Sequence, residues 1–143
     1  MKVFIAEDER PAMEMLVDEL NAIDQTIEVA GLGDSVSKSV SWLSANPAPD
    51  LIFMDIQLND GLSFEIFKAV NITSPVIFVS AFDKYLLQAF EYNSIDYLLK
   101  PVNAEKLRHA VRKYSNLRQH FTGNYGSLLD YLNGNRQTRS RIV

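Results

Sequence analysis

The sequence alternates five times between a short apolar run and a longer segment whose apolar residues have helical spacing. Most of the apolar runs contain few polar residues, as expected for strands that are covered by helices on both faces. A strand followed by a helix, repeated along one chain, predicts a parallel sheet with right-handed crossovers. We therefore expect an α/β fold with a doubly wound, five-stranded parallel sheet between two layers of helices.

The 143 residues suffice for one globular domain with a single sizeable core. The expected strands cover residues 2–6, 27–32, 51–55, 75–80 and 95–99. The expected helices cover residues 12–23, 36–46, 63–70, 84–93 and about 104–120.

Composition excludes several classes of function. A net charge of −4 argues against a nucleic-acid-binding surface for the chain as a whole. The absence of cysteine excludes disulfides, zinc–thiolate sites and thiol catalysis. The start, "MKVFIAEDE", lacks the pattern of a signal peptide, and no apolar segment approaches the roughly 20 residues of a membrane span. We expect a cytoplasmic protein without membrane contact.

In an open parallel sheet, ligands and chemistry collect at the carboxyl ends of the strands. Four of the five expected strands are followed there by polar side chains, which are Glu7 and Asp8, Asp55, Ser80, and Lys100. The second strand instead runs into Gly33 and Asp34, which suggest no chemistry.

Each of these side chains also has an ordinary structural explanation. Acids before a helix often cap its N-terminus, Ser80 could cap the fourth helix, and Lys100 could be a solvated charge. Taken singly, these explanations are at least as good as a functional one for most of the set. A pair of acids, a lone acid, a hydroxyl and a lysine on four strand ends of one sheet favour a common site.

The chemistry of this set is that of phosphoryl transfer. Carboxylates brought together need a cation, and oxygen ligands without His or Cys suit Mg²⁺. A lysine and a hydroxyl can bind phosphoryl oxygens. Carboxylates form aspartyl phosphates, so Asp55, at the end of the "LIFMD" strand, is the candidate nucleophile.

Four segments at their spacings resemble the receiver domains of two-component response regulators, over residues 1–120. They are "FIAEDE" (4–9), "LIFMDIQLNDG" (51–61), "VIFVSAF" (76–82) and "DYLLKPV" (96–102). The resemblance implies the flavodoxin-like strand order 2-1-3-4-5. It also implies that Asp55 accepts a phosphoryl group from a histidine kinase, and that the protein acts as a regulator rather than as an enzyme.

The resemblance assigns the remaining site residues. It implies that Mg²⁺ is held by Glu7, Asp8, Asp55 and the backbone carbonyl of Gln57, while Lys100 and Ser80 contact the phosphoryl group. It implies a cis peptide bond before Pro101. Tyr97 matches the aromatic residue that turns inward when the hydroxyl residue moves toward the phosphoryl group. The face formed by the fourth helix, fifth strand and fifth helix is then expected to form a homodimer, and Phe82, Tyr85 and Tyr92 would favour this if they were exposed.

The stretches 1–16 and 80–102 are more similar to receivers of the LytTR class of transcriptional regulators, which place a DNA-binding domain after the receiver. Residues 121–143 carry a net charge of +2 against −6 for residues 1–120. We expect residues 121–143 to be a linker, with DNA contacted only through a missing C-terminal domain; a natural short chain is the alternative.

Three other functions fit parts of the pattern. A hydrolase of the haloacid dehalogenase type also uses Mg²⁺, Asp and Lys, but its Asp-x-Asp motif lies on the first strand, whereas the sequence here is Asp55-Ile56-Gln57 on the third. An interaction module that needs no phosphorylation would not require the complete set of site residues. A flavodoxin-like cofactor binder would not place "AEDERP" after its first strand, because these acids repel phosphate.

Overall fold

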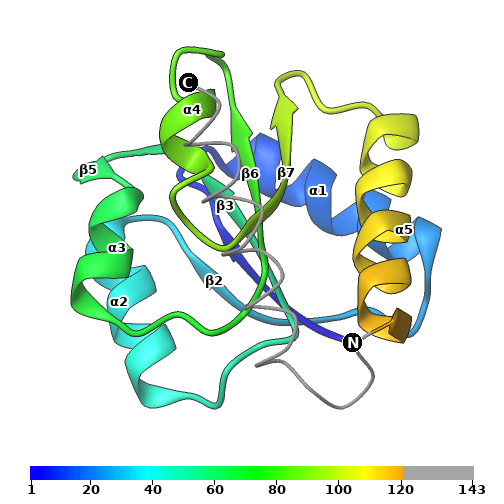
Figure 1. Cartoon of the computed structure of the whole chain (residues 1–143), viewed down its shortest axis with the longest axis horizontal. Helices are drawn as coiled ribbons and strands as arrows, with labels where there is room; N and C mark the ends of the chain where they lie inside the picture. Colours follow the sequence, from blue (N-terminus) through cyan, green and yellow to red (C-terminus); the bar gives the residue numbers. More distant parts are fainter. Residues whose placement is uncertain (121–143) are drawn as a thin grey trace.

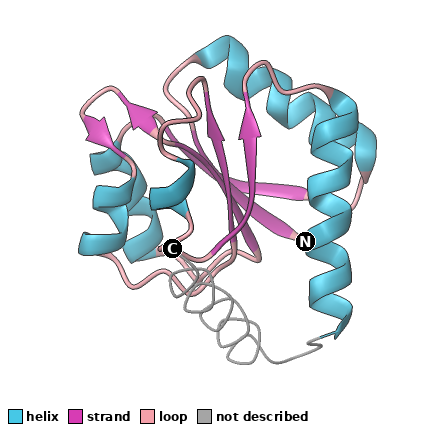
Figure 2. Ribbon diagram, turned by 45° about the horizontal axis from the view of Figure 1, so that its top comes forward, coloured by secondary structure: helices cyan, strands magenta, loops and turns pink. Residues whose placement is uncertain are grey.

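A parallel five-stranded sheet forms the centre of the computed structural model, which describes residues 1–120. Its strands lie in the order β2-β1-β3-β6-β7, which confirms the predicted doubly wound fold and its strand order. All neighbouring strands in this sheet are parallel (Figure 2). The strands are β1 (Lys2–Ala6), β2 (Glu28–Gly33), β3 (Leu51–Asp55), β6 (Val76–Ser80) and β7 (Ser94–Leu99).

Helices cover both faces of the sheet (Figure 1). One face carries α1 (Arg10–Ile23) and α5 (Ala104–His120). The other carries α2 (Val36–Ala45), α3 (Phe64–Ala69) and α4 (Leu86–Ala89). Every residue of β3 and β6 is buried, as expected for central strands covered on both sides.

The sheet divides the core into two clusters. Leu51 and Phe53 of β3 point into the cluster under α1 and α5, and Ile52 and Met54 point into the cluster under α2, α3 and α4. This alternation follows from the two-residue period of a strand, which sends successive side chains to opposite faces. Both faces of β3 therefore need apolar side chains, which explains why its apolar run is uninterrupted.

The fourth helix is much shorter than predicted. The apolar pattern of residues 84–93 predicts a helix of nearly three turns, but α4 covers only Leu86–Ala89. The chain turns after Ala89, whose carbonyl accepts a hydrogen bond of 2.8 Å from the Ser94 hydroxyl. Tyr92 packs against Phe64 and Phe67, with ring centroids 4.9 and 4.4 Å away, so its aromatic contacts favour the turn over a further helical turn.

A small hairpin after β3 was not predicted. Residues Gln57–Leu58 (β4) and Gly61–Leu62 (β5) pair antiparallel, and Gly61 has a φ angle of 146°, which side chains other than glycine rarely adopt. The Asp60 carboxylate accepts hydrogen bonds from the backbone N–H groups of Val36 (2.7 Å) and Ser37 (3.0 Å). These bonds lower the pKa of Asp60 and attach the hairpin to the N-terminus of α2.

Gly31 is a point of close approach between β2 and α2. It is paired in the sheet with Phe4, and the Trp42 ring of α2 lies over the position that a Cβ atom at Gly31 would occupy. The same indole is stacked on the Phe4 ring, with centroids 4.7 Å apart. A side chain at position 31 would therefore displace Trp42 from its contact with the sheet.

Among the described residues, no helix has the length and apolar character needed to cross a membrane. The basic stretch predicted to be a linker, residues 121–143, lies outside the part of the chain that the structure describes.

We predict that Gly31→Ala lowers the free energy of unfolding by about 1–3 kcal/mol, because the new methyl group forces the Trp42 ring off Phe4. Urea denaturation followed by circular dichroism measures the change. Trp42→Leu is the control background, in which the added methyl group has more room. An equal loss in both backgrounds would contradict the proposed steric cause.

Candidate functional site

The backbone ladder of the sheet continues past the strand ends and fixes the first residues of the site. The Glu7 N–H donates to the Gly33 carbonyl (2.9 Å), and the Lys100 N–H donates to the Ser80 carbonyl (2.8 Å). Asp55 is the last residue of β3 and lies beside Val79 of β6. The groups that follow β1, β3, β6 and β7 are therefore held at one edge of the sheet, as predicted from the rule for strand ends.

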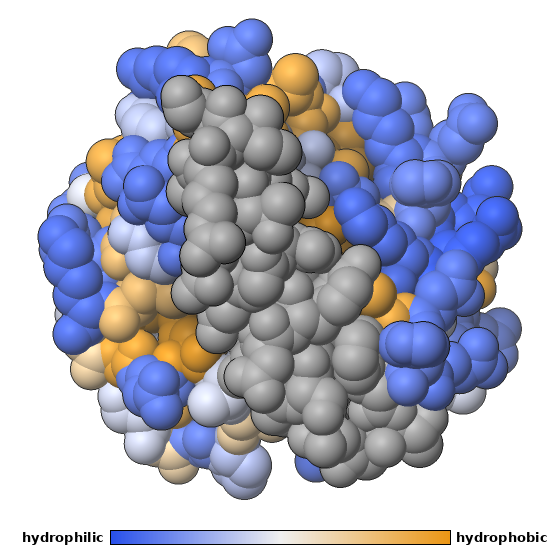
Figure 3. All heavy atoms as spheres, viewed as in Figure 1, coloured by the Kyte–Doolittle hydropathy of each residue, from blue (hydrophilic) through white to orange (hydrophobic). Residues whose placement is uncertain are grey.

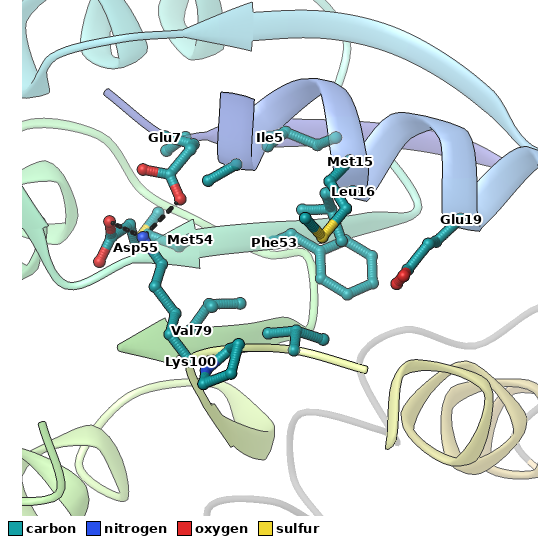
Figure 4. Close-up of a pocket in the computed structure, with 14 residues that line it drawn as sticks. Ile5, Glu7, Met15, Leu16, Glu19, Phe53, Met54, Asp55, Val79 and Lys100 are labelled. Atoms are coloured by element: carbon teal, nitrogen blue, oxygen red, sulfur yellow. Dashed lines mark hydrogen bonds and ion pairs between the residues drawn. The ribbon is translucent and has the colours of Figure 1, made fainter. Parts of the chain in front are cut away.

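The Lys100 ammonium group joins two acids from different strands (Figure 4). Its Nζ atom lies 2.7 Å from Glu7 Oε1 and 2.9 Å from Asp55 Oδ2. Glu7 and Asp55 are 8% and 6% exposed, so these are ion pairs with little access to water. A buried charged group is stable only with its partners, because removing an unpaired charge from water costs free energy.

Two opposing effects act on Lys100. Desolvation favours the neutral amine, but the hydrogen bonds and charges of Glu7 and Asp55 outweigh it and raise the pKa of Lys100 above its usual range. Lys100 therefore remains an ammonium group at neutral pH and provides a fixed positive charge beside Asp55.

Asp8 completes a cluster of three carboxylates. Glu7, Asp8 and Asp55 each offer an oxygen atom within 4.8 Å of the others. Burial raises the pKa of Asp8, and the neighbouring Glu7 carboxylate raises it further. Three acids facing one ammonium group leave an excess of negative charge at the cluster.

This excess charge fits a divalent cation. The donor atoms are all oxygens, which Mg²⁺ prefers, and Mg²⁺ also retains several waters. Asp8 and Asp55 line an open cleft of about 680 Å³, large enough for a hydrated ion and a phosphoryl group. Gln57 also lines this cleft, and its side chain donates to the Tyr85 hydroxyl (3.0 Å).

Ser80 and Tyr97 are linked through the backbone of one residue. The Phe82 N–H donates to Ser80 Oγ (3.1 Å), and the Tyr97 hydroxyl donates to the Phe82 carbonyl (2.6 Å). Burial raises the pKa of Tyr97 above its usual value. Ser80 and Tyr97 therefore each hold one backbone group of Phe82.

The structure brings Glu7, Asp8, Asp55, Gln57, Ser80 and Lys100 to this edge of the sheet. Tyr97 lies within β7, and its hydroxyl reaches the Phe82 carbonyl. The Lys100–Pro101 peptide bond is cis, as expected. Sequence reasoning missed two contributors, the Phe82 backbone and the Asp60 carboxylate. Backbone groups leave no signal in residue type, so Phe82 could not be identified. Asp60 lies directly before a glycine, a typical turn signal, but its partners on α2 are 23 and 24 residues away in the chain.

Comparisons with known proteins agree with this geometry. Residues 3–112 match the family model of the response regulator receiver domain. The chain is 35% identical over 122 residues to the sensory transduction protein LytT of Bacillus anthracis, covering 83% of this chain and 49% of the relative. It is 38% identical over 130 residues to a response regulatory protein of Vibrio cholerae, covering 90% and 53%.

A solved structure with the same fold is the response regulatory domain of protein mrkE from Klebsiella pneumoniae. The TM-score is 0.75 at 26% identity, and the match covers 84% of this chain and 99% of that one. The chain spans about half the length of the curated relatives that it matches. The strand order, the acids and lysine at the carboxyl edge of the sheet, and these matches agree that the chain belongs to the receiver domain family of two-component response regulators, of the LytTR type.

Proposed function

We propose that this receiver domain is a phosphorylation-dependent switch in which Asp55 accepts a phosphoryl group from a histidine kinase. The observation that carries the proposal is the position of the Asp55 carboxylate, at an open cleft, bonded to Lys100 and within 4.8 Å of Glu7 and Asp8. In the proposed reaction an Asp55 carboxylate oxygen forms a bond to phosphorus while the bond from phosphorus to the kinase histidine nitrogen breaks. The electrons of that bond stay with the imidazole, which takes up a proton.

The fixed charges of the site would neutralise the phosphoryl group. Lys100 is already bonded to Asp55 Oδ2 and needs only a small movement to pair with a phosphoryl oxygen on the same residue. Phosphoryl transfer depends mainly on positioning and on charge neutralisation, and the buried ion pairs of Lys100 supply both.

Glu7, Asp8, Asp55 and the Gln57 backbone carbonyl are the proposed holders of Mg²⁺. When bound, the ion would neutralise charge on the phosphoryl oxygens. Glu7 already pairs with Lys100, so we assign Asp8, which lines the cleft, the main role in recruiting the metal. Glu7 would then hold both Lys100 and the ion in place.

The Phe82 backbone would couple phosphorylation at Asp55 to the position of Tyr97. We assign the Ser80 hydroxyl a hydrogen bond to the phosphoryl group, which it reaches by giving up the Phe82 N–H. The Tyr97 hydroxyl holds the carbonyl of the same Phe82, so the two side chains can change together. This is a two-state element whose balance depends on different contacts in each state.

The proposed output is a homodimer through α4, β7 and α5. Four large apolar side chains are exposed on or beside these elements: Phe82 (46%), Leu86 (38%), Leu87 (75%) and Leu99 (40%). The outer surface on the α5 side is strongly hydrophilic (Figure 3), which is suited to the rim of such an interface. Tyr85 and Tyr92 are half-buried among aromatic rings, so they contribute less than the sequence suggested.

The remaining parts of the proposal concern the longer protein. The LytT relatives are about twice the length of the matched region, so they hold room for a further domain. We propose that this domain follows the receiver, is joined through residues 121–143 and binds DNA. A receiver dimer would place two such domains side by side, as paired DNA half-sites require. The domain would then act as a regulator in the cytoplasm and contact DNA only through its output domain.

We predict that acetyl phosphate adds one phosphoryl group to the chain, only in the presence of Mg²⁺, as measured by intact-protein mass spectrometry. Asp55→Asn removes the nucleophile, and its mass should not change. Asp18→Asn, which changes an exposed acid of α1, is the control and should be phosphorylated as the wild type is. Phosphorylation of Asp55→Asn at the wild-type rate would exclude the proposed nucleophile.

We predict that Asp8→Ala weakens Mg²⁺ binding at least about tenfold, because the cluster loses one of its three carboxylates. Isothermal titration calorimetry measures the affinity, and circular dichroism checks the fold. Glu14→Ala, which removes an exposed acid from α1, should bind Mg²⁺ as the wild type does. Unchanged affinity in Asp8→Ala would remove Asp8 from the metal site.

We predict that beryllofluoride with Mg²⁺ converts the protein to dimers in sedimentation velocity at about 100 µM, or roughly 5.5 kcal/mol of association free energy. Leu87→Asp should prevent this, because it places a charge in the proposed interface, whereas Leu32→Asp on the distant edge strand β2 should not. A protein that stays monomeric would refute the dimer. Dimers of equal strength in Ser80→Ala would refute the coupling through Phe82.

A further inference from the structure

A second cavity, separate from the cleft, lies between α1 and the sheet. Its volume is about 330 Å³, at the lower end of the range for small-molecule sites. Its walls are apolar and come from three directions: Leu16 from α1, Ile5, Phe53 and Val79 from the sheet, and Val102 from the loop before α5. Ile5 and Phe53 are core residues with almost no exposure, so they form a fixed layer beneath the half-buried Leu16 and Val102.

The inner end of the cavity is charged but already satisfied. Glu7, Asp55 and Lys100 line it, and they are joined to one another by the two short ion pairs (Figure 4). A ligand carboxylate placed there would have to compete with Glu7 and Asp55 for the same ammonium group. This end therefore does not favour an anion.

The opposite end carries Glu19 of α1. Figure 4 shows its carboxylate across the cavity from Lys100, with Met15, Leu16 and Phe53 between the two. No ion pair joins Glu19 to another residue in the part of the chain that the structure describes, and a carboxylate at the mouth of an apolar pocket attracts a cation. Three acids and one lysine line the pocket, so its overall charge also favours a positive ligand.

We propose that this pocket binds a small organic cation with a compact aromatic or alicyclic body and an ammonium group. The body lies against Met15, Leu16 and Val102, which are at least partly exposed, and there it gains the free energy of apolar burial. The ammonium group lies beside Glu19 and stays in contact with water. Asp55 and Lys100 line both this pocket and the cleft, so the ligand contacts the residues of the signalling site from the opposite side.

The test uses the full 143-residue chain with labelled methyl groups, observed by NMR without Mg²⁺ or a phosphodonor, so that it does not depend on the proposed function. The probes are 4-phenylbutylamine, 4-phenylbutanol and 4-phenylbutyrate, which share one body and differ in charge. We expect shifts of the Ile5, Leu16 and Val102 methyl signals, and the amine should bind about threefold tighter than the alcohol. The carboxylate should bind most weakly.

Substitutions test whether the probes bind in this cavity and whether Glu19 selects the amine. Glu19→Gln should remove the threefold preference for the amine, whereas Glu14→Gln, on the same helix but outside the pocket, should keep it. Ala12→Phe fills the cavity from its half-exposed rim and should weaken all probes by about tenfold. Met15→Trp fills it from another position if Ala12→Phe disturbs the fold.

Three results would overturn the proposal. No methyl shifts with any probe up to about 10 mM would show that the pocket binds none of them. Binding that both filling variants leave unchanged would place the site elsewhere. Tightest binding by 4-phenylbutyrate would show that Lys100, rather than Glu19, selects the ligand, which contradicts the assigned charge.

Discussion

The shared ion pair of Lys100 with Glu7 and Asp55 is the interaction on which the arrangement of the site depends. It joins the ends of β1, β3 and β7, which are separated by up to 93 positions in the sequence. An ammonium group at this depth is stable only because two carboxylates surround it, and the carboxylates need it in the same way. The cleft on one side and the apolar pocket on the other are both bounded by Asp55 and Lys100.

The sequence was a good guide to the fold where burial sets the pattern. Strands β3 and β6 lie between two helical layers, so their uninterrupted apolar runs predicted them to within one residue. The predicted length of α4 was wrong because the apolar residues of this segment do not share one buried face. Leu86 and Leu87 are exposed, whereas Tyr92 packs on Phe64. Helical spacing alone does not distinguish a buried stripe from an exposed apolar surface.

The candidate site was predictable for a different reason. In a parallel sheet all strand ends meet at one edge, so residues such as Glu7, Asp55 and Lys100 could be grouped by their positions directly after apolar runs. The links between the groups could not be predicted. The bonds of Phe82 to Ser80 and Tyr97 use its backbone alone, and the Asp60 bonds to α2 depend on how the hairpin folds back. Such contacts follow from tertiary geometry, which residue types do not encode.

The stacking of Trp42 on Phe4 gives this protein a built-in optical reporter. Trp42 is the single tryptophan of the chain, so its fluorescence comes from one known place, the contact of α2 with β1 and β2. The same helix receives the Asp60 carboxylate at its N-terminus, so its start is bonded to the hairpin that borders the cleft. Emission from the unlabelled protein therefore monitors the docking of α2, on the face of the sheet away from α1 and the apolar pocket.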